Sequence, residues 1–81
     1  MLSEIKDVKN RNRDLLMSLP NVVSLGIGPK IVKSVATETI AIKVFVSRKV
    51  HKSNLSKDER VPKQIEGFQT DVEVMERLKA L

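Results

Sequence analysis

Two runs of residues between Asn21 and Lys49 constrain the fold of this chain more than any other feature of its sequence. Both runs are rich in β-branched residues, which fit the pleated and half-buried surface of a sheet. Aliphatic side chains recur at every second position and would share one face: Val23, Leu25 and Ile27 in the first run, and Ile40, Ile42, Val44 and Val46 in the second. A period of two is the main sequence signal of a strand, and the short connection predicts an antiparallel hairpin.

The predicted hairpin consists of a first strand at Asn21–Val32, a turn at Lys33–Thr37 and a second strand at Glu38–Val50. The turn contains neither Asn-Gly nor Asp-Gly, so we expect a longer, mobile loop there. The other face of the second strand carries Ala41, Lys43, Phe45 and Ser47. Because Phe45 is large and apolar, we expect this face to be partly covered as well.

Gly26 and Gly28 interrupt the first strand in a Gly-x-Gly-Pro sequence. A nucleotide-binding loop would need a third glycine and a following helix, or the Lys-Ser/Thr pair of a P-loop, and the chain lacks these at this point. Glycine within a strand often marks a bulge or a close approach by another backbone. The sequence therefore predicts a bulge or bend here, with Pro29 at the bulge or on an edge strand.

The segments on either side of the hairpin complete a small α+β domain. Residues 1–19 have apolar side chains at spacings of three and four, with Ser3 as a plausible N-cap and an interruption at Asn12, and they predict a helix. Pro20 would end this helix, because the residue before a proline is disfavoured in the α region. Alternation over Phe68–Val74 predicts a third strand.

We expect one domain in which the N-terminal helix packs on a three-stranded antiparallel sheet. The helix would cover the aliphatic face of the hairpin. The expected domain spans residues 1–81, with the helix at 1–19, the sheet at 21–74 including a basic loop at 48–63, and a tail at 75–81.

The composition excludes several classes of protein. The chain has 81 residues, no Cys, no Trp and no Tyr, and its two aromatic residues are Phe45 and Phe68. Disulfides, thiol chemistry and cysteine-based zinc sites are therefore excluded, and stacking of single-stranded bases is disfavoured. No apolar run has the length of a membrane span, and the N-terminus lacks the apolar core of a signal peptide, so we expect a cytoplasmic protein or a fragment of a longer one.

The net charge of +5 is concentrated in the middle of the chain, where residues 30–63 hold nine basic residues against three acidic ones. Such an excess attracts polyanions, although it also occurs on surfaces that are merely solvated. One set after the second strand is the candidate patch for an anion or a partner: Arg48, Lys49, Lys52, Lys57, Arg60 and Lys63. We expect this patch to be a solvated rim rather than a nucleic-acid site.

The sequence offers no constellation typical of catalysis. His51 is the single histidine, and no carboxylate is placed to orient its ring as a general base would require. Asp58 and Glu59 belong to a capping-box pattern that predicts a helical turn near Ser56–Arg60. The scattered carboxylates also lack the spacing of a metal site. We therefore expect no enzyme, no metal and no cofactor.

Three sequence blocks, in order, carry a resemblance to a known family: Leu-Pro-Asn-Val-Val-x-x-Gly-x-Gly at Leu19–Gly28, Ala-Ile-x-Val-Phe-Val-x-x-Lys at Ala41–Lys49, and Arg-Val-Pro-Lys-x-Ile-x-Gly-x-x-Thr-Asp-Val at Arg60–Val72. This series resembles the N-terminal segment ahead of the catalytic domain in a group of bacterial trypsin-like serine peptidases. The resemblance covers most of residues 15–74. It implies an accessory module of a peptidase-related protein and carries over no catalytic residue.

Two functions remain open from the sequence. The first is a non-catalytic protein-interaction or accessory module, which could associate with itself through open strand edges. The second is a small basic nucleic-acid-binding protein that uses the middle third of the chain. We expect the first, because aromatic platforms are scarce and no recognition-helix pattern is present.

Overall fold

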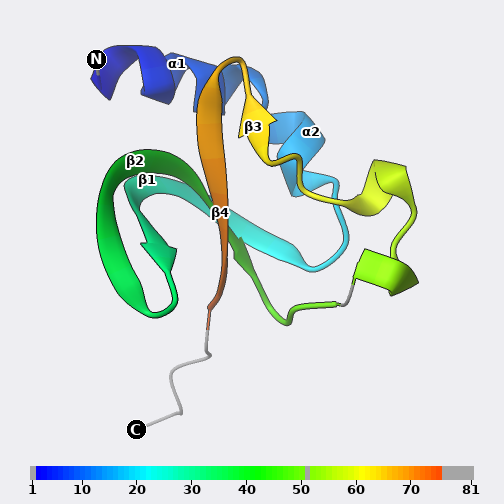
Figure 1. The fold of residues 1–81 in the computed structure, drawn as a ribbon. Helices are drawn as coiled ribbons and strands as arrows, with labels where there is room; N and C mark the ends of the chain where they lie inside the picture. Colours follow the sequence, from blue (N-terminus) through cyan, green and yellow to red (C-terminus); the bar gives the residue numbers. More distant parts are fainter. Residues whose placement is uncertain (1, 51, 76–81) are drawn as a thin grey trace, which may run out of the picture.

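An N-terminal helical segment packs on a mixed β-sheet in the computed structural model of the chain, which describes residues 2–50 and 52–75 (Figure 1). In chain order the elements are α1 (Leu2–Arg11), α2 (Arg13–Met17), β1 (Val22–Val32), β2 (Val35–Val46), the 3-10 helices η1 (Lys52–Asn54) and η2 (Lys57–Glu59), β3 (Gln64–Ile65) and β4 (Phe68–Val74). The predicted α+β class is confirmed. His51 and residues 76–81 of the predicted tail lie outside the described residues.

The helical segment has the predicted interruption at Asn12, which separates α1 from α2. The Asn12 side-chain amide donates to the Val8 carbonyl at 2.8 Å and to the Glu66 carboxylate at 2.9 Å. Asparagine competes for backbone groups in this way, which explains why it favours helix ends and turns. Arg11 reaches the same carboxylate with its guanidinium, at 2.6 Å. The break in the helix is therefore tied to the turn between β3 and β4.

The helical segment buries an apolar stripe against one face of the sheet. The buried core consists of Ile5, Val8, Leu16, Leu19, Ile42 and Ile65, with Val22, Leu25, Ile27, Val61 and Phe68 packed against it. Leu16 and Ile42 are fully buried. Burial of apolar surface is the main favourable term in folding, so this interface holds the helices on the sheet.

Val23 was expected on the covered face, but 45% of its surface is exposed. The register between β1 and β2 shifts between Val22 and Ser24, so one extra residue interrupts the alternation there. A shift of one residue moves side chains to the opposite face of a strand. Val22 consequently packs against the core in place of Val23.

The bend that was predicted near the glycines lies just after them. A second register shift falls between Pro29 and Ile31, and Pro29 is on β1, which is an edge strand, as predicted. Ile40, the partner of Pro29, is 42% exposed although the sequence placed it on the covered face. Around this shift the hairpin bends and its far end curls back on itself (Figure 1).

The prediction of a three-stranded antiparallel sheet is wrong. Within the described residues the sheet has four strands in the order β1-β2-β4-β3, and β2 pairs with β4 in parallel. The connection through η1, η2 and β3 returns the chain to the start of β4, so β4 runs in the same direction as β2. Alternation reveals a strand but not its direction, and β3 has two residues, too few to show a period.

The hairpin turn is also tighter than expected. Two residues, Lys33 and Ser34, connect the strands, and both have positive φ angles of 50° and 67°. Positive φ at both positions is the feature of the primed turns that match the twist of a hairpin. Because these turns usually contain Asn or Gly, the sequence Lys-Ser predicted a mobile loop and concealed the turn.

The far half of the hairpin curls back over the face of the sheet that the helices leave uncovered (Figure 1). There the backbone N–H of Ile31 donates to the Asp71 carboxylate at 2.9 Å, and the Lys30 ammonium donates to Gln69 at 3.0 Å. Phe45 lies on this face, and its ring is so close that a Cβ on Gly26 would approach Phe45 Cε2 to 3.1 Å. The expectation that this face is partly covered is confirmed, and the two glycines make room for side chains.

Among the described residues, no helix is both long enough and apolar enough to cross a membrane.

Candidate functional site

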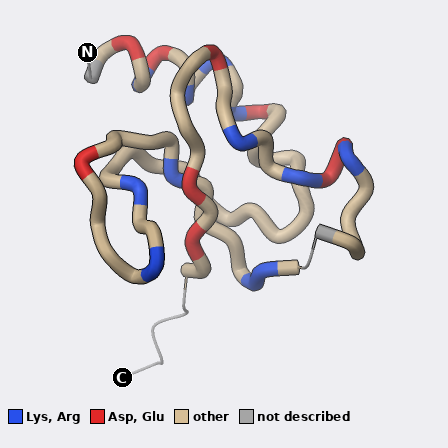
Figure 2. Tube along the Cα trace, in the orientation of Figure 1, with Lys and Arg blue, Asp and Glu red and all other residues tan. Residues whose placement is uncertain are grey.

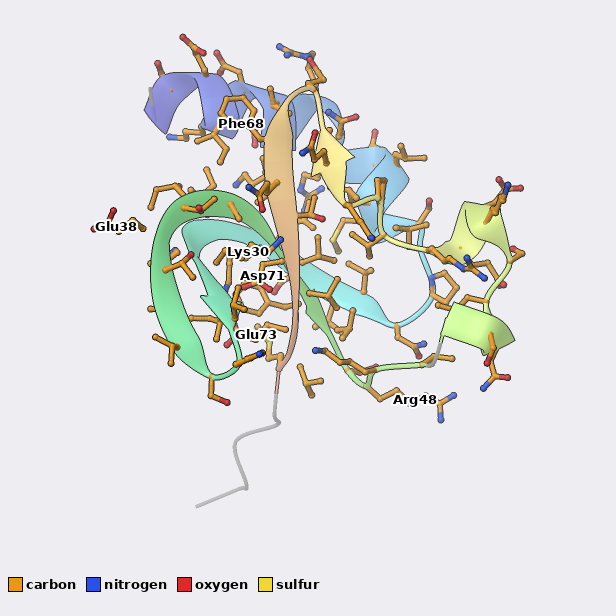
Figure 3. The ribbon with its side chains drawn as sticks, in the orientation of Figure 1. Lys30, Glu38, Arg48, Phe68, Asp71 and Glu73 are labelled. Atoms are coloured by element: carbon orange, nitrogen blue, oxygen red, sulfur yellow. The ribbon has the colours of Figure 1, made fainter. Side chains whose placement is uncertain are left out.

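A buried lysine, Lys43, forms the centre of the polar contacts under the curled hairpin. Its ammonium lies 2.6 Å from the Asp71 carboxylate, 3.2 Å from the Glu73 carboxylate and 3.1 Å from the Pro29 carbonyl. An ammonium has three N–H donors, so three acceptors satisfy it. In Figure 3, Asp71 and Glu73 lie between β4 and the hairpin, with Lys30 nearby.

The charges of this cluster stabilise one another. Burial lowers the pKa of Lys43, but hydrogen bonds to Asp71 and Glu73 outweigh it and raise the pKa above the ordinary value. Burial likewise raises the pKa of Asp71, but the Lys43 ammonium and the Ile31 N–H lower it below the ordinary value. Both groups are thus charged at neutral pH, whereas a general base or nucleophile needs a pKa shifted toward neutrality. The cluster fixes the hairpin on β4.

Four residues of the predicted basic patch line hollows that have Lys49 in common. Arg48, Lys49 and Arg60 line one at the end of β2, and Lys49 lines another with Lys63. Lys57 lies on η2. The side chain of Lys52 lies outside the described residues. Acidic positions of η2 interrupt the basic stretches along this connection (Figure 2).

The segment that carries these residues is held by local backbone contacts. The predicted capping box is present, with the Ser56 N–H donating to Glu59 Oε1 at 2.9 Å. Arg60 donates from Nε to the Leu55 carbonyl at 3.3 Å. Such contacts order the connection between β2 and β3 that carries these residues.

Two adjoining hollows follow the side of β4 that β3 leaves uncovered, and we call them together the β4 groove. One is lined by Ile31, Lys33, Ser34, Lys49 and residues 71–74, and the other by Lys30, Lys49, Val61, Lys63, Gln64 and residues 69–72. One wall of the groove is the hairpin end, and the other is the connection between β2 and β3. Lys49 is common to both hollows.

The floor of the groove is an open strand edge. The Thr70 N–H donates to the Lys63 carbonyl at 3.0 Å, away from β2, whereas the Met75 N–H donates to the Val46 carbonyl at 2.8 Å, toward β2. Because backbone groups alternate along a strand, the N–H and C=O groups of Val72 and Val74 point away from β2.

In the described part of the chain no strand pairs with these two residues, since β3 pairs with β4 at Phe68 and Gln69. An edge of this kind is a template for another strand.

Comparison with known protein families identifies the family of this domain. Residues 1–75 match the family described as the NARROW LEAF 1 N-terminal domain. The chain belongs to this family. No curated protein matches the chain.

Membership of the NARROW LEAF 1 N-terminal domain family corrects the resemblance drawn from the sequence, because the matching family is not the N-terminal segment of bacterial trypsin-like peptidases. The three blocks that suggested those peptidases consist mostly of hydrophobic strand residues and turn residues. In the structure they fall on β1, β2 and β4 with their connections. Alternation of this kind follows from a half-buried sheet and therefore carries little information about family.

Sequence reasoning missed both the Lys43 cluster and the groove. A usable signal existed for the cluster, because Lys43 lies between apolar Ile42 and Val44 in the most apolar strand of the chain. A lysine at such a position needs a carboxylate partner when it is buried. Asp71 and Glu73 lie two apart in the predicted strand Phe68–Val74 and so share a face, but nothing in the sequence pairs that face with Lys43.

Proposed function

We propose that this domain is a non-catalytic protein-interaction module that binds an extended polypeptide by adding it to the edge of β4. One observation carries the proposal: within residues 2–50 and 52–75 the backbone groups of Val72 and Val74 have no strand partner on the side away from β2, and both residues line the groove. In strand addition, main-chain hydrogen bonds supply affinity and neighbouring pockets supply specificity.

The edge of β4 carries neither a proline nor a bulge, two of the devices by which proteins block strand pairing. Its exposed end presents the apolar residues Val74 and Met75, which are 39% and 44% exposed. Further apolar side chains lie exposed near the hairpin turn: Ile31, Val32 and Val35. An exposed apolar rim beside an unpaired edge favours a polypeptide partner.

A nucleic-acid partner is the second candidate, and the lysines of the β4 groove are the observation that favours it. Base stacking would need an accessible aromatic ring. Phe45 packs over Gly26 and Phe68 packs against the core, so neither is placed to serve as such a platform. We therefore rank nucleic acid below a polypeptide.

The experiment is an NMR titration of the labelled domain with a seven-residue peptide of alternating Thr and Val. We expect the largest amide shift changes at Val72 and Val74. The variant Val74→Pro removes one edge N–H donor at the end of β4 and should weaken binding about fivefold, the value of one net hydrogen bond. Val74→Thr keeps the donor and the β-branch, and it should bind like the original chain. Shift changes confined to other surfaces would contradict strand addition.

A further inference from the structure

We infer that the strand accepted by the β4 groove is an acidic one, an extended segment in which Asp or Glu alternates with small or β-branched residues. This inference rests on the proposed function and adds the chemical class of the partner. The lysines on the two walls carry it: Lys30, Lys33, Lys49 and Lys63. Unlike charges placed across an interface raise the rate and the specificity of association.

The acidic residues of the groove cancel only part of this charge. Asp71 and Glu73 line it, and both carboxylates contact the buried Lys43 ammonium, so the three groups together carry one negative charge against the four wall lysines. Lys30 donates to Gln69, a neutral partner, and its charge also acts on the Asp71 carboxylate, whose pKa it helps to lower. The groove therefore keeps an excess of positive charge beside the unpaired backbone of β4.

The positions of the lysines match the alternation of an added strand. Successive side chains of a strand point to opposite faces of the sheet. One set would point toward the hairpin end, which carries Lys30 and Lys33, and the other toward Lys49 and Lys63 on the opposite wall. An acidic residue on either face of the added strand would meet a lysine.

Two other occupants fit less well. A second copy of the chain paired edge to edge would bring two sets of these lysines together, and like charges oppose such pairing. A nucleic acid would satisfy the lysines but would leave the alternating N–H and C=O groups of Val72 and Val74 unmatched. A polypeptide strand matches both the charge and the backbone.

The test uses three peptides of equal length with the same Thr-Val core and with Glu, Gln or Lys at the remaining positions. We expect the Glu peptide to bind at least about tenfold more tightly than the Gln peptide at low salt, and this ratio to fall as salt screens the charges. The Lys peptide should bind most weakly. Equal binding of all three at Val72 and Val74 would overturn the inference and leave strand addition intact, whereas the absence of edge binding by any peptide would overturn both.

Charge-removing variants supply the control. The double variant Lys49→Gln with Lys63→Gln should reduce the affinity for the Glu peptide about tenfold. Its affinity for the Gln peptide should stay unchanged, since the double variant loses only the electrostatic part of the binding free energy. Lys57→Gln, on η2 outside the groove, should change neither.

Two further measurements address the other occupants. The first is a titration with single- and double-stranded oligonucleotides. The inference would be overturned in favour of nucleic acid if an oligonucleotide bound saturably, displaced the Glu peptide and had a higher affinity than that peptide. A micromolar dimer in sedimentation velocity that dissociates with Val74→Pro would overturn it in favour of a second copy.

Discussion

Replacing Lys43 with methionine is expected to lower the free energy of unfolding by about 3 kcal/mol, because breaking a buried ion pair leaves an uncompensated charge. Methionine keeps the unbranched shape, so the packing over Gly28 is preserved while the ammonium is lost. The Lys43 side chain is 6% exposed and that of Asp71 is 11% exposed, so water replaces the lost contact poorly. Small domains have a total stability of roughly 5–15 kcal/mol, so the loss is large.

Urea unfolding measures this effect, and two further variants define its origin. Lys33→Met, at the exposed hairpin turn, should stay within about 0.5 kcal/mol of the original chain, as is usual for surface substitutions. The double variant Lys43→Met with Asp71→Leu should recover much of the loss, since replacing both partners by apolar groups is often neutral. A loss below about 1 kcal/mol for Lys43→Met alone would show that the cluster does not hold the hairpin.

Leu16→Ala is expected to lower the free energy of unfolding by about 2–5 kcal/mol, the range for buried leucines. Leu16 is fully buried between α2 and the sheet, where it belongs to the core that contains Ile5 and Ile42. Removing its side chain loses apolar burial and leaves a cavity. The loss should appear as a lower denaturation midpoint with an unchanged dependence on denaturant.

The neighbouring residue gives a matched control for this variant. Leu15 lies on the same helix but is 60% exposed, so Leu15→Ala should change stability by less than about 0.5 kcal/mol. Equal effects of the two substitutions would mean that α2 does not pack as the structure shows. A larger effect of Leu15→Ala would indicate that this residue is covered, for example by another copy of the chain.

The sequence predicted the elements whose residues alternate or repeat along one face. β1, the core of β2, β4 and the helical segment with its interruption at Asn12 were all placed before their packing was known. The sequence did not predict irregularities of a single residue. The extra residue between Val22 and Ser24 exposes Val23, and positive φ at Lys33 makes a tight turn from residues that seldom form one.

The parallel pairing of β2 with β4 could not be predicted, because it depends on the path of the connection between them. That connection contains two short 3-10 helices and a two-residue strand, none of which gives a periodic signal. The β4 groove depends on the same pairing. Of its four lysines, Lys49 and Lys63 belonged to the predicted basic patch, whereas Lys30 and Lys33 come from the hairpin, which is distant in sequence.

Hydrogen exchange at the backbone of β4 tests the central claim, that this strand has an open edge which accepts a polypeptide. The N–H groups of Val72 and Val74 point away from β2, whereas those of Asp71 and Glu73 point toward it. Groups without a hydrogen-bonded partner exchange through small local openings. We predict fast exchange at Val72 and Val74 and slow exchange at Asp71 and Glu73. When the acidic peptide is added, the amides of Val72 and Val74 should become protected. Equal protection at all four positions in the chain alone would contradict the open edge.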